Sequence, residues 1–245
     1  TLGGGGHARL ILDLIGETGM FLGIDRDTLA IEAFKNSFIG NKPKIILVND
    51  NFSVLPQILV RERLPRADGL LLDLGISSDQ LECAGRGFSF QKNEPLLMTF
   101  SDDQKSVRDI LDEIDEDELA GIIKEYSDEH YSRSIAREIK RRLPIATTWA
   151  LRDAVLSGVS ANYENGRIDP ATRTFMALRI YANQEFENLK IILSKLNSII
   201  KPGGRIAVIT FHSNEDRIVK NALRDAAKAG ILKLINKKVI IDEYS

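Results

Sequence analysis

The sequence predicts an α/β fold with a parallel, doubly wound sheet into which a helical segment is inserted. Short apolar runs alternate with amphipathic stretches, as they do where crossover helices connect parallel strands. The glycines Gly3–Gly6 stand directly before a helical pattern, and such a turn lets the backbone approach a ligand closely. Between residues 101 and 169 the charge pattern changes and the periodicity becomes entirely helical.

The composition excludes several classes of protein. The 245 residues are 43% hydrophobic, which is enough for a sizeable core, and no apolar run reaches the length of a membrane-spanning helix. The net charge is −2, so any nucleic-acid binding must come from local clusters of cations. Cys83 is the only cysteine, which indicates a reducing, cytoplasmic environment, and no set of residues has the spacing of a metal site.

The first hundred residues predict strands that are separated by helices. A helix is expected from Ala8 to Ile15, and Asp27 and Ser53 are expected to cap the helices after the next two strands. A glycine turn normally leaves the end of a strand, so we also expect a strand upstream of Thr1. Within the first hundred residues, strands are expected at Met20–Asp25, Ile45–Val48 and Asp68–Gly75.

The middle of the chain predicts a helical insertion. Residues 101–128 contain eleven acids and three Lys or Arg, and the balance reverses from residue 129 to 152. We therefore expect a core in two parts, residues 1–100 and 170–245, with the insertion at 101–169. The second part should contain a helical stretch at Ala171–Lys195, a tight turn at Lys201–Arg205, a strand at Ile206–Phe211, a helix at Glu215–Ala229 and a last strand at Lys233–Ile241.

The residues at the strand ends predict a ligand-binding crevice, because ligands of open α/β sheets bind beyond the carboxyl ends of the strands. Asp25 stands where an acid would grip ribose hydroxyls, and Phe52 could stack on a planar base or pack in the core. The other candidates, drawn from the glycine turn and from the later strand ends, are Gly5, Gly6, His7, Asp73, Gln80 and His212.

A second candidate surface is a row of cations. Arg133, Arg137, Lys140 and Arg141 are spaced to share one face of a helix, where they could contact RNA phosphates. The alternative is a solvated face that pairs with the preceding acidic stretch.

The chemistry of the crevice leaves alternatives. The pattern Gly3-x-Gly5-x-x-Ala8 with Asp25 downstream also fits a dinucleotide fingerprint, so a nicotinamide-dependent oxidoreductase competes with a methyltransferase. The Lys201–Arg205 turn before a strand and the acid at Asp73 favour a Rossmann-like, S-adenosylmethionine-dependent methyltransferase. A hydrolase would need a G-x-S-x-G elbow, which surrounds no serine of the sequence.

Several joined motifs resemble the MraW/RsmH family of ribosomal RNA small subunit methyltransferases. They are Thr1–His7, Asp73–Leu81, Arg86–Phe90, Pro170–Phe175 and Phe211–Lys220. The resemblance implies a Rossmann-like class I domain with an inserted all-helical domain, and transfer of a methyl group from S-adenosylmethionine to N4 of a cytidine in the decoding region of 16S rRNA. It implies a substrate within the small ribosomal subunit and leaves a homodimer open. The implied cofactor contacts are Gly5, Gly6, His7, Asp25, Phe52, Asp73 and Gln80.

The resemblance also bears on catalysis and on RNA binding. Asp73 would hold the reacting amine, and His212 would accept or relay its proton or fix a neighbouring acid. Arg173, in the Pro170–Phe175 motif, joins the candidates for RNA binding. The chain departs from the family pattern at Leu97, Thr99, Asp169 and Asn214, which keeps open a non-catalytic RNA-binding protein with a relic cofactor cleft.

Overall fold

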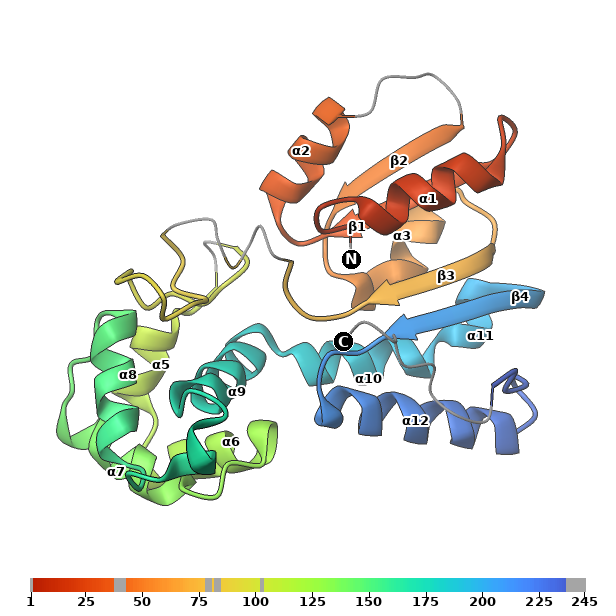
Figure 1. Cartoon of the computed structure of the whole chain (residues 1–245). Coiled ribbons are helices and arrows are strands. Elements are labelled where there is room, and N and C mark those ends of the chain that lie inside the picture. Colours follow the sequence, from red (N-terminus) through yellow and green to blue (C-terminus); the bar gives the residue numbers. More distant parts are fainter. Residues whose placement is uncertain (1, 38–42, 78–80, 82–84, 102–103, 237–245) are drawn as a thin grey trace. The chain divides into compact units, whose positions relative to one another are not determined.

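The computed structural model describes residues 2–37, 43–77, 81, 85–101 and 104–236. The chain divides into two compact units. Their helices and strands are labelled in Figure 1. Unit 1 consists of Thr1–Asp50 and Ile76–Glu185, and unit 2 consists of Asn51–Gly75 and Phe186–Ser245. Each unit contains one pair of parallel strands, so the parallel pairing that the sequence predicts is confirmed within each pair.

Unit 1 begins with two helices and a pair of strands. Strand β1 (Met20–Asp25) pairs with β2 (Lys44–Asn49) in parallel register, and the helices are α1 (Gly6–Ile15) and α2 (Thr28–Ser37). Asp27 caps α2 as predicted, because its Oδ1 atom accepts a hydrogen bond of 2.9 Å from the backbone N–H of Leu29. The buried cluster beside these elements consists of Leu2, Ala8, Leu12 and Phe34.

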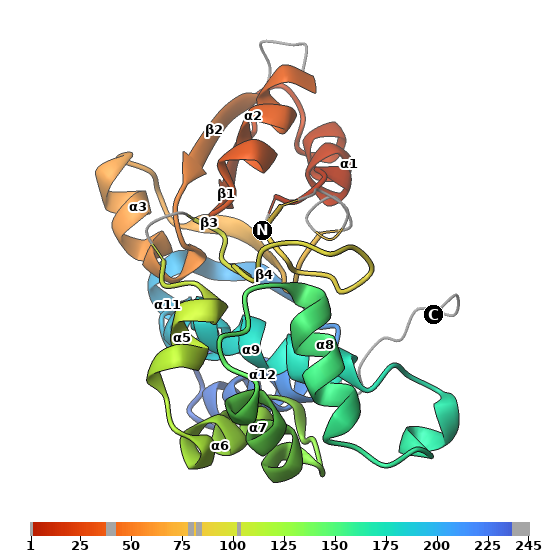
Figure 2. The same cartoon turned by 90° about the vertical axis from the view of Figure 1, so that its left-hand side faces the viewer.

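The rest of unit 1 combines a non-helical segment, described at residues 85–101, with the helices that follow it, and the two share one buried core drawn from residues 88–178. Helix α6 packs against α7 and α9, and α8 packs against the same two helices (Figure 2). Polar caps at Ser106, Asp115 and Thr147 begin α5, α6 and α8. The elements are α5 (Val107–Glu113), α6 (Glu116–Ser127), α7 (Ser132–Arg141), α8 (Thr148–Ser157), the 3₁₀ turn η2 (Tyr163–Gly166) and α9 (Ala171–Asn183).

Unit 2 contains the second strand pair, in which β3 (Ala67–Asp73) runs parallel to β4 (Ile200–Ile209). The prediction that Ser53 caps the helix after β2 is wrong. A 3₁₀ turn precedes that helix, so Val54 stands at the N-cap of the helix without a side-chain hydrogen bond. Asn51 caps the 3₁₀ turn instead, and its side chain accepts a 2.9 Å hydrogen bond from the N–H of Ser53. The helical elements are η1 (Phe52–Val54), α3 (Leu55–Arg61), α10 (Glu185–Ser194), α11 (Leu196–Ile199) and α12 (Ser213–Lys228).

Strand β4 begins earlier than the sequence predicts. Ile200 pairs with Ala67 and Arg205 pairs with Gly69, so residues 201–204 bulge out of the ladder instead of preceding the strand. Gly203 accommodates the bulge with a φ of +83°. Residues 233–236, where the last strand was expected to begin, are not in a strand, and the remainder of that prediction lies outside the described residues.

Within the described residues, no helix combines the length and the apolar character that crossing a membrane requires.

Candidate functional site

The glycine turn of unit 1 presents its backbone at the start of α1. Gly3 and Gly5 have φ values of +50° and +77°, in the left-handed region that favours glycine. Gly5 is the N-cap of α1 and has no side chain with which to cap it, and the N–H groups of a first helical turn lack intrahelical acceptors. Gly6 and His7 follow it and are both exposed. This helix end can therefore receive an anionic group of a ligand.

Gly5 is buried and Gly6 is exposed, and the two positions differ in the space available for a side chain. A Cβ atom at Gly5 would lie 2.6 Å from Cδ2 of Phe34, so packing alone requires glycine there. A Cβ atom at Gly6 would meet no described atom within 4 Å. Open space beside Gly6 is what a backbone-binding ligand needs, whereas the space beside Gly5 is already filled.

Asp25, the last residue of β1, binds this turn through side-chain hydrogen bonds. Its side chain is buried, and its Oδ2 atom accepts hydrogen bonds of 3.0 Å from the N–H groups of Leu2 and Gly3. Its Oδ1 atom accepts a third, of 2.9 Å, from the N–H of Asp27. The carboxylate thus holds the turn against the strand end, which is a role that the sequence did not indicate. Its contact with a ribose stays a prediction.

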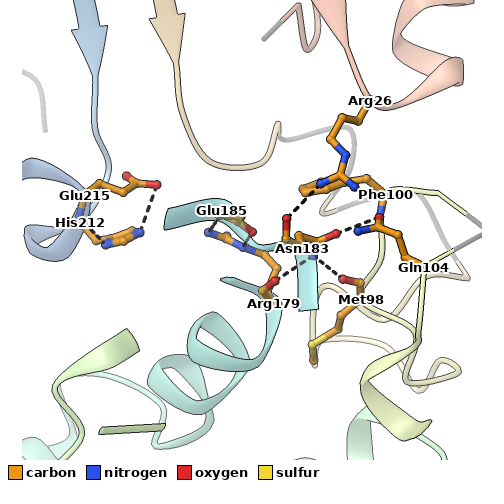
Figure 3. Close-up of polar contacts among 9 residues, drawn as sticks. All are labelled: Arg26, Met98, Phe100, Gln104, Arg179, Asn183, Glu185, His212 and Glu215. Atoms are coloured by element: carbon orange, nitrogen blue, oxygen red, sulfur yellow. Dashed lines mark hydrogen bonds and ion pairs between the residues drawn. The ribbon is translucent and has the colours of Figure 1, made fainter. Parts of the chain in front are cut away.

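A buried amide joins the end of α9 to the loop before the helices (Figure 3). Asn183 is 1% exposed, and its Nδ2 atom donates to the carbonyls of Met98 and Arg179 over 2.7 and 2.8 Å. Its Oδ1 atom accepts a 3.2 Å hydrogen bond from the N–H of Phe100. Its main-chain carbonyl accepts a 3.0 Å hydrogen bond from Nη1 of Arg26. Every polar atom of this buried side chain is used, as a rigid junction requires.

Arg26 therefore connects the end of β1 to this junction. Its guanidinium carbon lies 5.8 Å from the centre of the Phe100 ring, within the range of a cation–π contact. Arg26 directly follows Asp25 in the chain. Asp25 therefore binds the glycine turn, and the next residue binds the end of α9. Sequence reasoning missed Arg26 and Asn183. The available signal was that Asn183 follows the buried Ile180 by three positions and so falls on the inner face of α9.

In unit 2, Asp73 lies at the end of a strand, as the sequence predicts. Asp73 is the last residue of β3, is half-buried and lies opposite Ile209 in the ladder. Phe52 is half-buried in η1, directly after the Asn51 cap. Gln80, the remaining cofactor candidate, lies outside the described residues.

His212 is the N-cap of α12, and both nitrogens of its ring face the first turn of that helix (Figure 3). Its Nδ1 atom accepts a long hydrogen bond of 3.4 Å from the N–H of Glu215, and its buried Nε2 atom lies 3.2 Å from Oε1 of the same residue without hydrogen-bond alignment. The Glu215 carboxylate is 3% exposed and accepts a 3.0 Å hydrogen bond from the N–H of Phe211. This geometry favours the alternative in which His212 fixes a neighbouring acid.

The four predicted cations on α7 do not behave alike. Arg133, Arg137 and Arg141 are exposed, whereas Lys140 is half-buried and donates to the carbonyl of Leu111. The predicted cationic face is therefore carried by the three arginines, and Lys140 instead binds a backbone carbonyl.

Two of these arginines also have acidic neighbours. The Nε atom of Arg137 lies 3.5 Å from a carboxylate oxygen of Glu116, and Arg141 bonds Glu138 over 2.6 Å. The hydrogen bond from Arg141 lowers the pKa of Glu138 below its usual value. Exposed pairs of this kind are weak, so they leave the arginines available to compete for phosphates.

Arg173 lies beside a buried acid rather than in open solvent. Its Nη1 atom lies 3.8 Å from Oε2 of Glu129, which is fully buried, and its side chain is 27% exposed. Tyr163 donates its hydroxyl to the same oxygen, and the N–H of Tyr131 donates to Oε1 over 2.8 Å. Arg173 thus offsets the charge of Glu129, which an RNA-binding assignment alone does not explain.

Two of the residues that depart from the family pattern, Asp169 and Asn214, form hydrogen bonds within the fold. Asp169 accepts hydrogen bonds of 3.1 and 2.7 Å from Arg152 and one of 2.9 Å from the N–H of Ala171, at the start of α9. Asn214 is buried and accepts a hydrogen bond from Arg217. Each therefore has a structural function of its own at the position it occupies.

The comparisons with known proteins agree along the whole chain. The MraW methylase family matches residues 1–242. Ribosomal RNA small subunit methyltransferase H of Syntrophotalea carbinolica is 42% identical over 94% of this chain and 75% of its own length. The proteins of the same name from Trichlorobacter lovleyi and Koribacter versatilis are 43% and 41% identical, over 93% and 98% of this chain and 74% and 79% of their own lengths. The chain belongs to the MraW methylase family.

Proposed function

We propose that this chain is an S-adenosylmethionine-dependent methyltransferase that methylates N4 of a cytidine in the decoding region of 16S rRNA. The observation that carries the proposal is the family match over residues 1–242, together with relatives that are named ribosomal RNA small subunit methyltransferase H. The fold we propose is a Rossmann-like class I domain in two parts, residues 1–100 and 170–245, with an all-helical domain at 101–169. The parallel strand pairs support the α/β part of this proposal.

The glycine turn fits the proposed cofactor. An exposed helix N-terminus that has glycine at its cap suits a ligand carboxylate, and the open space at Gly6 leaves room for it. Gly5, Gly6, His7 and Asp25 would contact the cofactor, and Asp25 also holds the turn through its hydrogen bonds to Leu2 and Gly3. Phe52, Asp73 and Gln80 complete the proposed set. When bound, S-adenosylmethionine supplies a methyl group that its sulfonium has already activated.

Asp73 is proposed as the residue that orients the reacting amine. The lone pair of the cytosine N4 amine is delocalised into the ring, so the amine is a weak nucleophile that must be aligned. A carboxylate at the end of β3 can accept the hydrogen bonds of the amine and hold its nitrogen toward the methyl group. His212, whose ring nitrogens face Glu215, would support the start of α12, and its direct proton transfer remains the alternative.

RNA would be held by the helical part of unit 1. The exposed guanidinium groups of Arg133, Arg137 and Arg141 would contact phosphates, and the target base would be splayed out of its stack. Lys140 and Arg173 would contribute less, because both are only partly exposed and contact a backbone carbonyl and a buried carboxylate, respectively. The substrate would be the small ribosomal subunit in the cytoplasm, and a homodimer stays open.

A methyl-transfer assay tests the proposal. The full chain is incubated with radiolabelled S-adenosylmethionine and small subunits from cells that lack this methyl group, and the labelled nucleoside is identified. We expect label in N4-methylcytidine, and Asp73→Asn should lose turnover by orders of magnitude without losing the fold. Subunit binding without transfer would favour the non-catalytic protein. Tight binding of NADH with no affinity for S-adenosylhomocysteine would favour the oxidoreductase.

A further inference from the structure

An aromatic ring stands exposed at the carboxyl end of β4. Phe211 follows the strand by two residues and is 68% exposed. A single exposed apolar side chain is ordinary on a protein surface, so exposure alone carries no conclusion. What distinguishes Phe211 is that the surrounding backbone holds the ring at a strand end, where ligands of parallel sheets bind.

The ring lies against Gly75, two residues after the end of the neighbouring strand β3. Gly75 has a φ of +81°, and a Cβ atom there would lie 3.1 Å from Cδ2 of Phe211. Asp73 and Ile209 are partners in the ladder, and the chain continues two residues beyond each of them to reach Gly75 and Phe211. The ring of one strand therefore covers the backbone of the other just past their last paired residues.

The backbone of Phe211 is also fixed from the other side. Its N–H donates a 3.0 Å hydrogen bond to the buried carboxylate of Glu215, whose position is set by the first turn of α12 and by the contact with His212. The ring is thus exposed, while its own backbone is anchored by Glu215 and one edge of the ring lies against Gly75. A rigid aromatic face binds a planar partner at a lower entropic cost than a mobile one does.

We propose that Phe211 is the stacking surface for the target cytosine, an inference that rests on the proposed function. Enzymes that modify a base remove it from its stack and receive it between aromatic or apolar side chains. Two residues of chain span at most about 7 Å, so the seat of the ring at Gly75 lies close to Asp73. A cytosine that lies on the Phe211 face can then present its exocyclic amine to the carboxylate that is proposed to hold it.

The test compares Phe211→Ala, Phe211→Leu and Phe211→Trp with the unmodified chain, and Val60→Ala is the control. Val60 is 80% exposed and lies on α3, so its truncation also removes an exposed apolar side chain, but outside the part of unit 1 that is proposed to hold RNA. The measurements are kcat/KM for small subunits, affinity for an rRNA fragment, affinity for S-adenosylhomocysteine and Tm. Stacking of a base on an aromatic ring predicts that Phe211→Ala lowers kcat/KM for RNA roughly 5- to 150-fold.

The remaining variants separate stacking from other effects. Phe211→Trp should keep most of the activity, Phe211→Leu should resemble the alanine variant, and none should change Tm or S-adenosylhomocysteine affinity. Unchanged RNA kinetics in Phe211→Ala would overturn the inference, and so would a loss confined to S-adenosylhomocysteine affinity, which would mean that the ring holds the cofactor's adenine. If the unmodified chain transfers no methyl group, the proposed function fails. In that case the affinity for the rRNA fragment still tests the inference about Phe211. If Phe211→Ala and the unmodified chain bind the fragment equally well, the stacking is rejected.

Discussion

The Oδ2 atom of Asp25 lies 3.0 Å from the backbone nitrogen of Gly3, so the last carboxylate of β1 holds the glycine turn in place. Asp25→Ala should therefore reduce the free energy of unfolding by about 2–4 kcal/mol, because the N–H groups of Leu2 and Gly3 lose a buried acceptor. Denaturant unfolding measures this change. If Asp25→Ala lost cofactor affinity but kept the unmodified stability, the carboxylate would serve the ligand rather than the turn.

Gly6 provides a cleaner test of the cofactor site than Gly5 does. Gly6→Val should leave the fold intact, because a side chain there meets open space, but should weaken S-adenosylhomocysteine binding roughly tenfold or more by blocking a charge-assisted backbone hydrogen bond. Calorimetric titration measures the affinity. Gly121→Val on α6 is the matched control, since a Cβ there also meets no described atom within 4 Å. Equal affinities in the two variants would contradict the site.

Gly5→Ala should instead destabilise the protein with or without a ligand. The added methyl group would collide with the Phe34 ring at 2.6 Å and would occupy a left-handed backbone conformation. We expect a loss of about 1–3 kcal/mol of unfolding free energy. A thermal melt in the absence of cofactor measures it, and an unchanged Tm would show that Phe34 can move aside.

Arg173 should prove more important for stability than for RNA binding. Arg173→Ala leaves the buried Glu129 carboxylate with less positive charge nearby, so we expect a loss of roughly 2 kcal/mol, below the value for a fully buried pair because Arg173 is partly exposed. Combining it with Glu129→Gln should recover part of that loss. A double variant that is stable but still binds RNA poorly would assign Arg173 to the RNA surface after all.

Charge reversal on α7 should reduce RNA affinity in a salt-dependent manner. Arg133→Glu combined with Arg137→Glu should weaken binding of an rRNA fragment and lower the slope of log K against log salt by about one for each phosphate contact removed. Filter binding at several salt concentrations measures this. Reversal of Arg224 and Lys228, which are exposed on α12, is the control. Equal effects from both pairs would indicate a general charge effect and not an RNA-binding face.

Local patterns predicted the elements whose residues decide their own conformation. Asp27 caps α2 because an Asp side chain reaches its own backbone two residues on, and helix α12 follows from its amphipathic spacing. The placement of Asp73 at the end of β3 follows from the apolar run before it.

The errors occurred where distant segments decide the outcome. The bulge at residues 201–204 depends on how β3 pairs with β4, and spacing along a helix does not reveal that Lys140 reaches the carbonyl of Leu111. The role of Asn183 depends on Met98 and Phe100, which lie more than 80 positions away. Contacts of this kind leave no pattern among neighbouring residues, so residue spacing and periodicity in a single sequence do not predict them.

The hydrogen bond between Phe100 and Asn183 spans 83 positions of the chain. Helices α5–α8 lie between these two residues and α9 ends at Asn183, so the two ends of this segment of the chain meet at one hydrogen bond. A segment whose two ends already meet can be lengthened, shortened or exchanged without separating what it is attached to. Helices α5–α8 are in that sense part of a segment that insertions or deletions can alter while its two ends stay joined.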